Sequence, residues 1–175
     1  MTETIRYAWG ESSLGNFIVA LSQRGVVALD FDEPGPAFLA VLRQRFPGAV
    51  LVEDPQSLAG TIALAAALIE RPERTSDLPL DPRGSEFELH VWNALRQIPA
   101  GETASYSEIA ARIGAPRETR EVGEACASNR LAILIPCHRV VKKDGSIAGY
   151  RWGVRRKRAL LARERQAAQP RMTLF

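Results

Sequence analysis

The sequence predicts an α/β protein of the α+β kind, arranged as two domains and a short tail. Residues 1–80 alternate strand-like and helix-like segments, which predicts a small N-terminal α/β domain with a short sheet. The proline-rich stretch 71–84 breaks that pattern and indicates a connector. Residues 81–168 contain two short helical segments joined by a tight turn, the pattern of a helix-turn-helix, and residues 169–175 form the tail.

The N-terminal domain is expected to hold three strands followed by two helices. Residues 6–12, 15–25 and 26–33 are rich in β-branched and aromatic residues and are broken by Gly and Ser, which predicts short strands. Residues 37–47 carry apolar residues at helical spacing, and Pro47-Gly48 ends this helix. Residues 57–70 predict the second helix, and no residue of this domain suggests chemistry.

The second domain begins with a helix and a helix-turn-helix. Residues 86–97 place Phe87, Val91 and Leu95 on one helical face. Ser105 and Glu108 form a capping box that opens a helix through Ile113. Residues 114–116 then make a tight turn, and the helix that follows, at about 117–128, would be the recognition helix.

The rest of this domain is expected to be an extended run, a loop and a basic helix. Residues 131–136 are apolar and predict an extended, buried segment. Residues 142–145 are typical of a hairpin turn that leads into a wing or loop, and residues 154–167 predict a last helix rich in Arg.

Composition and charge narrow the class of protein. The chain has a net charge of +3, but residues 1–85 hold 7 Lys/Arg against 11 Asp/Glu, whereas residues 86–175 hold 16 against 9. A basic half is where a polyanion such as nucleic acid would bind, although surface charge can also segregate without function. No apolar run is long enough to span a membrane, and no secretory signal is visible. The two cysteines favour a reducing, cytoplasmic setting over a disulfide framework.

Cys137 is the strongest candidate for a reactive residue. A thiol reacts as a thiolate, so an active Cys needs neighbours that lower its pKa, and His138 is one candidate. Adjacent residues on an extended strand point to opposite sides, so we expect His138 to reach Cys137 around a corner or through a water. Several alternatives stay open from spacing alone. Cys137 could be a small buried apolar residue, and a Cys-His hydrolase would need an oxyanion hole that nothing marks. The spacing of two Cys and two His fits no zinc site.

The segment Ile135-Pro136-Cys137-His138-Arg139-Val140 resembles the active-site motif of the O6-alkylguanine-DNA alkyltransferases, the methylated-DNA–protein-cysteine methyltransferases. The surrounding motifs agree in order: Gly-Glu-Thr at 101–103, Ser-Tyr at 105–106, Ala-Cys-Ala-Ser-Asn at 125–129, Gly-Tyr-Arg-Trp-Gly at 149–153, Lys157, and Leu-Leu-Ala-Arg-Glu at 160–164. The similarity is dense from about Asp81 to Glu164 and is greatest to the C-terminal domain of the bacterial adaptive-response alkyltransferase.

This resemblance implies a winged-helix-like second domain and a single-use repair reaction on double-stranded DNA. O6-alkylguanine would be flipped out of the duplex, and its alkyl group would pass irreversibly to Cys137 without a cofactor or metal. The resemblance implies that Glu164 orients His138, that His138 takes the thiol proton through a water, that Asn129 braces the turn, and that Tyr106 gives a proton to guanine N3.

The resemblance also implies DNA contacts. Arg120 matches the residue that fills the vacated stack, and further contacts are expected from Thr119, Ser105, Arg117, Arg139, Tyr150 and Arg151. The chain departs from the family at Glu121, where a small residue is usual, and at the N-terminus, where the zinc ligands of some members are absent. Carboxylates near phosphates would weaken DNA binding.

Three further expectations follow. The tail 169–175 is similar to short peptides that dock on the bacterial sliding clamp; the alternatives are a frayed end or a tail packed on its own domain. The protein is expected to be a monomer in the bacterial cytoplasm, at the nucleoid. The rival functions are a lesion-binding alkyltransferase-like protein without chemistry, which would lack the reactive Cys, and a transcription regulator that uses the helix-turn-helix alone.

Overall fold

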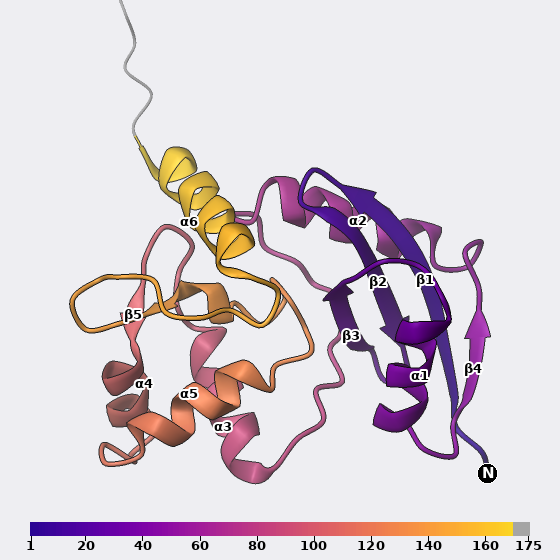
Figure 1. Cartoon of the computed structure of the whole chain (residues 1–175), viewed down its shortest axis with the longest axis horizontal. Helices are drawn as coiled ribbons and strands as arrows, with labels where there is room; N and C mark the ends of the chain where they lie inside the picture. Colours follow the sequence, from indigo (N-terminus) through magenta and orange to yellow (C-terminus); the bar gives the residue numbers. More distant parts are fainter. Residues whose placement is uncertain (170–175) are drawn as a thin grey trace, which may run out of the picture. The chain divides into compact units, whose positions relative to one another are not determined.

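The structure is a computed structural model that describes residues 1–169. The chain forms two compact units (Figure 1). The first unit contains Met1–Glu70, Ser76–Gly84 and Arg130–Leu134, and the second contains Arg71–Thr75, Ser85–Asn129 and the chain from Ile135 onward. The sequence predicts one domain boundary, near residue 80. In the structure, residues 130–134 also belong to the first unit, so the chain passes between the two units more than once.

The first unit is a four-stranded sheet with the order β3-β2-β1-β4. β1 (Thr4–Ser12), β2 (Gly15–Leu21) and β3 (Val26–Phe31) form an antiparallel meander, and β4 (Val50–Glu53) pairs with β1 in parallel. The predicted three strands and two helices are confirmed. β4 was not predicted, because it has only four residues and the two at its ends are exposed.

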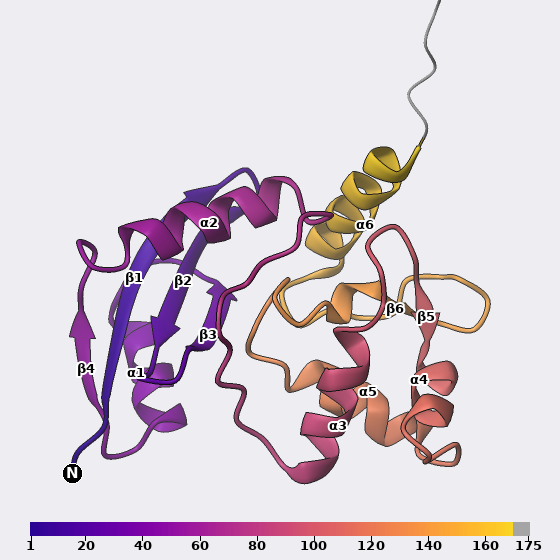
Figure 2. The same cartoon turned by 180° about the vertical axis from the view of Figure 1, so that it is seen from behind.

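Two helices cover opposite faces of this sheet (Figures 1 and 2). α1 (Pro36–Arg45) packs Phe38 and Leu42 against Ile5 and Ile18. α2 (Ala59–Glu70) lies on the other face, close to Gly10. A Cβ at Gly10 would lie 2.4 Å from the Phe17 ring and 2.8 Å from Ile62 of α2, so only glycine allows this packing.

The second unit is built on α3 (Glu86–Leu95), α4 (Tyr106–Arg112) and α5 (Thr119–Ala127). The predicted helix-turn-helix of α4 and α5 is confirmed. Ser105 and Glu108 form the expected capping box, and Gly114 takes the left-handed conformation, with φ of 77°. The indole Nε1 of Trp92 in α3 donates to the Ala125 carbonyl at 2.8 Å, which fixes α5 on α3.

The remaining elements of this unit connect the helix-turn-helix to the last helix. The two-residue strands β5 (Ala104–Ser105) and β6 (Val140–Val141) pair in parallel. The turn at 142–146 leads into a loop, and α6 spans Val154–Ala168. Residues 131–136 are buried as predicted, but the prediction of an extended run is wrong. They form turns in which Ile133 has a φ of 68°, after a single bridge from Leu131 to Leu29.

No helix within residues 1–169 is long and apolar enough to cross a membrane. The tail predicted to dock on a sliding clamp lies outside the described residues, apart from Gln169.

Candidate active site

Cys137 opens a single 3₁₀ turn, Cys137–Arg139, directly after Pro136. Its side chain is buried, with 4% of the residue exposed. A 3₁₀ turn advances by about 120° per residue, so neighbouring side chains leave it in different directions. The extended geometry predicted here is wrong, and the expected corner between Cys137 and His138 is this turn.

Asn129, just beyond α5, holds the turn and contacts the sulfur. Its Nδ2 donates to the Ile135 carbonyl at 2.9 Å and to Cys137 Sγ at 3.2 Å. The residue is 1% exposed, so this bond is shielded from water. An N–H donor favours the negative form of sulfur over the neutral form.

His138 points into the interior, where it meets Glu164 of α6. Its Nε2 lies 2.8 Å from Glu164 Oε1, and both side chains are almost completely buried. Burial on its own would raise the pKa of Glu164, but hydrogen bonds from His138 and Arg139 outweigh it and hold that pKa below its ordinary range. A carboxylate can only accept, so Nε2 carries the proton and Nδ1 keeps its lone pair. Nδ1 is buried and has no hydrogen-bond partner within the described chain.

Arg139 was predicted to contact DNA, but the structure places it inside the second unit. Its guanidinium donates to both oxygens of Glu164 at 2.8–3.1 Å. It also donates to the carbonyls of Ile98, at 2.7 Å, and Pro72, at 3.2 Å. The side chain is 11% exposed. Arg139 therefore holds the Glu164 carboxylate in position, and Glu164 in turn orients the His138 ring.

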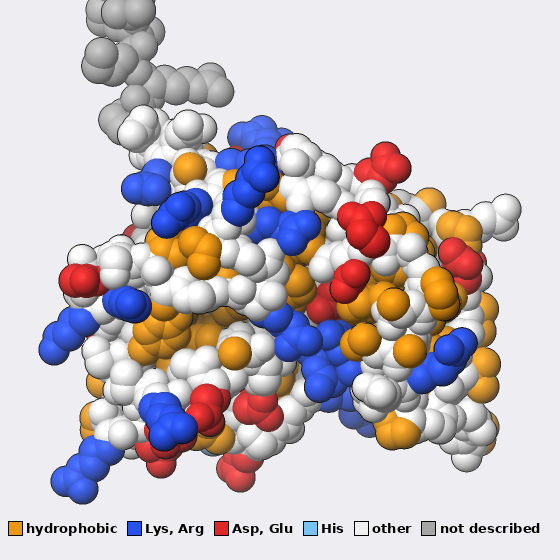
Figure 3. All heavy atoms as spheres, viewed as in Figure 1, with side chains coloured by type: hydrophobic (Ala, Val, Ile, Leu, Met, Phe, Trp, Pro, Cys, Tyr) orange, Lys and Arg blue, Asp and Glu red, His pale blue; other side chains and the backbone are white. Residues whose placement is uncertain are grey.

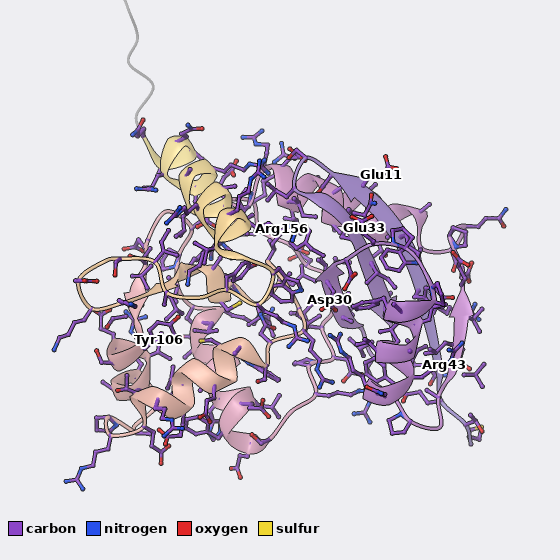
Figure 4. The ribbon with its side chains drawn as sticks, in the orientation of Figure 1. Glu11, Asp30, Glu33, Arg43, Tyr106 and Arg156 are labelled. Carbon is purple, nitrogen blue, oxygen red and sulfur yellow. The ribbon has the colours of Figure 1, made fainter. Side chains whose placement is uncertain are left out.

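A pocket of about 360 Å³ opens beside Cys137. One side is formed by Gly149, Tyr150 and Arg151 of the loop, and the other by α4 and α5 through Tyr106, Gly123, Cys126 and Ala127. Figure 3 shows a hollow with hydrophobic side chains between this loop and α4 and α5. Figure 4 shows Tyr106 at the start of α4, beneath the loop. The structure thus brings Cys137, Tyr106, Tyr150 and Arg151 to one pocket.

Burial sets the protonation states in this site. It raises the pKa of the Cys137 thiol to about 11, although Asn129 and the positive charges of Lys157 and Arg151 oppose the rise. Burial lowers the pKa of His138, and Glu164 offsets this only in part. At neutral pH the thiol therefore keeps its proton and the imidazole is uncharged. A neutral imidazole beside a thiol is arranged to act as a base.

Comparisons with known proteins agree with this site. The model of the 6-O-methylguanine DNA methyltransferase DNA-binding domain matches residues 86–166. The inducible methylated-DNA–protein-cysteine methyltransferase of Bacillus subtilis is 39% identical over 154 residues, which are 87% of this chain and 86% of that protein. The chain belongs to the methylated-DNA–protein-cysteine methyltransferase family.

Two further relatives place the chain within this methyltransferase family. The crystal structure of Mycobacterium tuberculosis OGT in complex with DNA has a TM-score of 0.78 and 36% identity, covering 93% of this chain and 94% of that chain. The bifunctional transcriptional activator/DNA repair enzyme Ada of Escherichia coli is 44% identical over 160 residues, which are 91% of this chain and 45% of Ada. The chain spans about half the length of Ada and of the similar regulatory protein from Salmonella typhimurium.

The other residues predicted to contact DNA divide between the surface and the interior. Arg117 and Arg120 are exposed, and Thr119 is half-buried at the start of α5. Ser105 is buried, and its hydroxyl accepts from the Glu108 amide as the N-cap of α4. Arg151 donates to the Ala127 carbonyl at 3.1 Å and lies over the Trp152 ring.

Two residues of this site, Cys126 and Lys157, match the family motifs, but the sequence analysis assigned neither of them a role. Cys126 of α5 lines the same pocket as Cys137. Lys157 is 1% exposed, and its Nζ lies 3.4 Å from the Gly149 carbonyl in the pocket loop. The sequence does carry a signal for Lys157, because Lys157, Leu160, Leu161 and Glu164 have the i, i+3, i+4, i+7 spacing of a buried face. No cluster of metal-ligating side chains occurs among the residues that the structure describes.

Proposed function

We propose that this protein repairs O6-alkylguanine in double-stranded DNA by transferring the alkyl group to its own Cys137, once per molecule. The observation that carries this proposal is the placement of Cys137 in a pocket, hydrogen-bonded to Asn129, beside the buried His138–Glu164 pair. The Bacillus subtilis and Mycobacterium tuberculosis relatives support it by their names.

The pocket requires the damaged nucleotide to leave the duplex. Cys137 is buried beside a recess, with 4% of the residue exposed, and guanine O6 in a stacked pair does not reach its thiol. We propose that α5 lies on the DNA and that Arg120, which extends into solvent, fills the gap in the base stack. Thr119 and Arg117, at the start of α5, would contact the backbone.

The chemistry is a displacement at the alkyl carbon. The S–C bond forms as the bond between carbon and O6 breaks, and the thiol proton moves to His138 Nδ1 through one water. Glu164 stabilises the imidazolium that results. The departing guanine takes a proton at N3 from the Tyr106 hydroxyl. Tyr106 regains a proton from solvent and His138 releases its own to solvent, so the net products are S-alkylcysteine and guanine. Burial raises the pKa of Tyr106 to about 12, so it holds its proton until it is needed.

The loop of residues 147–152 would read the flipped base. Tyr150 lines the pocket, and its buried hydroxyl has no hydrogen-bond partner within the described chain. It can therefore bond to the bound base, while Arg151 closes the rim and backbone carbonyls near Val140 accept from the guanine edge. No cofactor takes part. We place the protein in the cytoplasm at the nucleoid and expect it to act as a monomer.

Mass spectrometry tests the proposal directly. The protein is incubated with a duplex carrying one O6-methylguanine, and intact and peptide masses are measured. We expect one methyl group on the Cys137 peptide, saturating at one per protein, and no change in Cys137→Ser. Binding of the lesion duplex without a change in mass would instead make this a lesion-binding protein without chemistry.

A further inference from the structure

The exposed surface of α5 carries carboxylates where the proposed function puts DNA. Glu118 stands at the N-cap position without a side-chain capping bond, and Glu121 and Glu124 follow on the helix. Figure 3 shows acidic and basic side chains mixed over α3 and α5. Arg120 Nε lies 3.4 Å from Glu124 Oε1, and these side chains are 87% and 66% exposed. The residue proposed to enter the base stack is thus paired with a carboxylate in the free protein.

Helix geometry separates Glu124 from Glu121. Arg120 and Glu124 are four residues apart and share one face, opposite the buried Val122 and Ala125. Gly123 and Ala127, beside this face, line the pocket. Glu121 lies on the other flank, seven residues before Ser128, whose hydroxyl bonds to Glu88 of α3. Glu124 therefore lies on the face of Arg120, and Glu121 lies on the side of α3.

An ion pair this exposed is weak, so DNA can break it at little cost. The pair matters instead for how strongly the protein binds undamaged duplex compared with lesion duplex. On an undamaged duplex, where Arg120 stays outside the stack, Glu124 cancels its charge and repels the phosphates, so fewer counterions are released. On a lesion duplex, Arg120 leaves Glu124 to fill the gap, and the carboxylate stays hydrated.

We propose that Glu124 is a specificity-determining residue that weakens binding to undamaged duplex more than binding to a duplex with a flipped nucleotide. This inference rests on the proposed function, since it needs Arg120 to enter the stack. It assigns to the Glu124 carboxylate a role in discriminating damaged from undamaged DNA.

The test compares Glu124→Gln with Glu121→Gln, which removes the same charge from the same helix. Dissociation constants are measured for an undamaged duplex and for its O6-methylguanine counterpart, with Cys137→Ser in each protein so that no transfer occurs, over a series of salt concentrations. We expect Glu124→Gln to tighten undamaged binding roughly fivefold, the factor for one unit-charge interaction at about 4 Å in water. We also expect the slope of log K against log salt to steepen by up to about one.

Lesion binding should tighten less than twofold in Glu124→Gln, so that the preference for damage falls, and Glu121→Gln should change both duplexes by less than twofold. Equal effects of the two variants would mean that only net charge matters and would overturn the proposal. An unchanged preference for damage in Glu124→Gln would overturn it as well. Methyl transfer is measured separately with Cys137 intact, so a failure of the proposed function is seen independently of these binding ratios.

Discussion

At the scale of single residues, the reactive centre combines an acid and a base that are both uncharged at rest. Burial raises the pKa of the Cys137 thiol to about 11 and lowers the pKa of His138 below its ordinary value of 6.5. The base is active when neutral, so transfer should be constant around neutral pH and should fall in acid as His138 becomes protonated. The fall begins below pH 6.5 because the pKa is depressed.

Replacing His138 with Ala tests this assignment. We expect the single-turnover methylation rate at pH 7 to drop by about 100-fold or more, the usual contribution of a general base. The residual rate should rise with pH toward the pKa of Cys137, because only thiolate formed without help can react. The rate is measured from pH 5 to 9, with His90→Ala, a change at the exposed second histidine, as the control. Parallel pH profiles for wild type and His138→Ala would remove His138 from the role of base.

At the scale of elements, the Ser105 hydroxyl has two candidate roles. It caps α4 in the structure, and the sequence predicts that it contacts DNA. The Ser105 side chain accepts from the Glu108 amide at 3.1 Å and begins α4, the helix that carries Tyr106. Ser85 makes the same capping box at the start of α3. The two serines therefore allow a matched comparison of capping with DNA contact.

Ser105→Ala and Ser85→Ala should each lower the free energy of unfolding by about 1 kcal/mol, the usual value of an N-cap. If Ser105 acts as a cap, the affinity of folded Ser105→Ala for duplex DNA should stay within twofold of wild type. Urea denaturation and fluorescence anisotropy measure the two quantities. A loss of affinity in Ser105→Ala that Ser85→Ala does not share would restore the predicted DNA contact.

The elements of the second unit were largely predictable, because each has a local signal. Capping residues, the Gly114 turn and apolar spacing mark α3, α4, α5 and α6. The failures have non-local causes. β4 depends on pairing with β1, some 45 residues away, and the residues at its two ends are exposed. Residues 131–136 look extended because they are apolar, but Ile133 has a positive φ, which a β-branched residue rarely adopts and no local pattern indicates.

The sequence predicted which residues gather at the candidate site better than it predicted where Arg139 and Lys157 lie within it. Cys137, Asn129 and the His138–Glu164 pair are together as the resemblance implied. Arg139 was misplaced because a basic residue in a basic half suggests DNA, whereas its partners, Glu164 and the carbonyls of Ile98 and Pro72, come from segments 25 to 67 residues away. Lys157 was noted as a matching residue but its burial was not predicted, because a charged side chain normally indicates exposure.

At the scale of the whole molecule, the ion pair of Arg139 and Glu164 links segments that are distant in sequence. It joins α6 to the 3₁₀ turn, and Arg139 also bonds to the connector through Pro72. Removing one partner of a buried pair leaves the other charge in a poor environment. Global stability, and not only chemistry, should therefore depend on Glu164.

Glu164→Gln should lower the free energy of unfolding by about 3 kcal/mol at pH 7. The folded-state pKa of Glu164 lies below its ordinary value of 4.5, so the carboxylate stabilises above that pH and its contribution is lost as pH falls through the folded pKa. The difference between the two proteins should therefore narrow below pH 4.5, where wild-type Glu164 also becomes neutral. Urea denaturation at pH 7, 5 and 3.5 measures this, with the exposed Glu102→Gln as control. A constant difference across this range would show that side-chain shape, and not charge, matters.

The burial of Cys137 has a consequence if, as proposed, each molecule reacts only once. Peroxides, small electrophiles and free thiols in the cell attack or exchange with thiolates that they can reach, whereas this sulfur is buried and keeps its proton. The unreacted protein should therefore resist oxidation and modification at Cys137, and few copies should be inactivated before they meet a lesion. A completed adduct would be a thioether, which cellular thiols do not reduce. The capacity of a cell for this repair would then equal its stock of unspent molecules, replenished only by new synthesis.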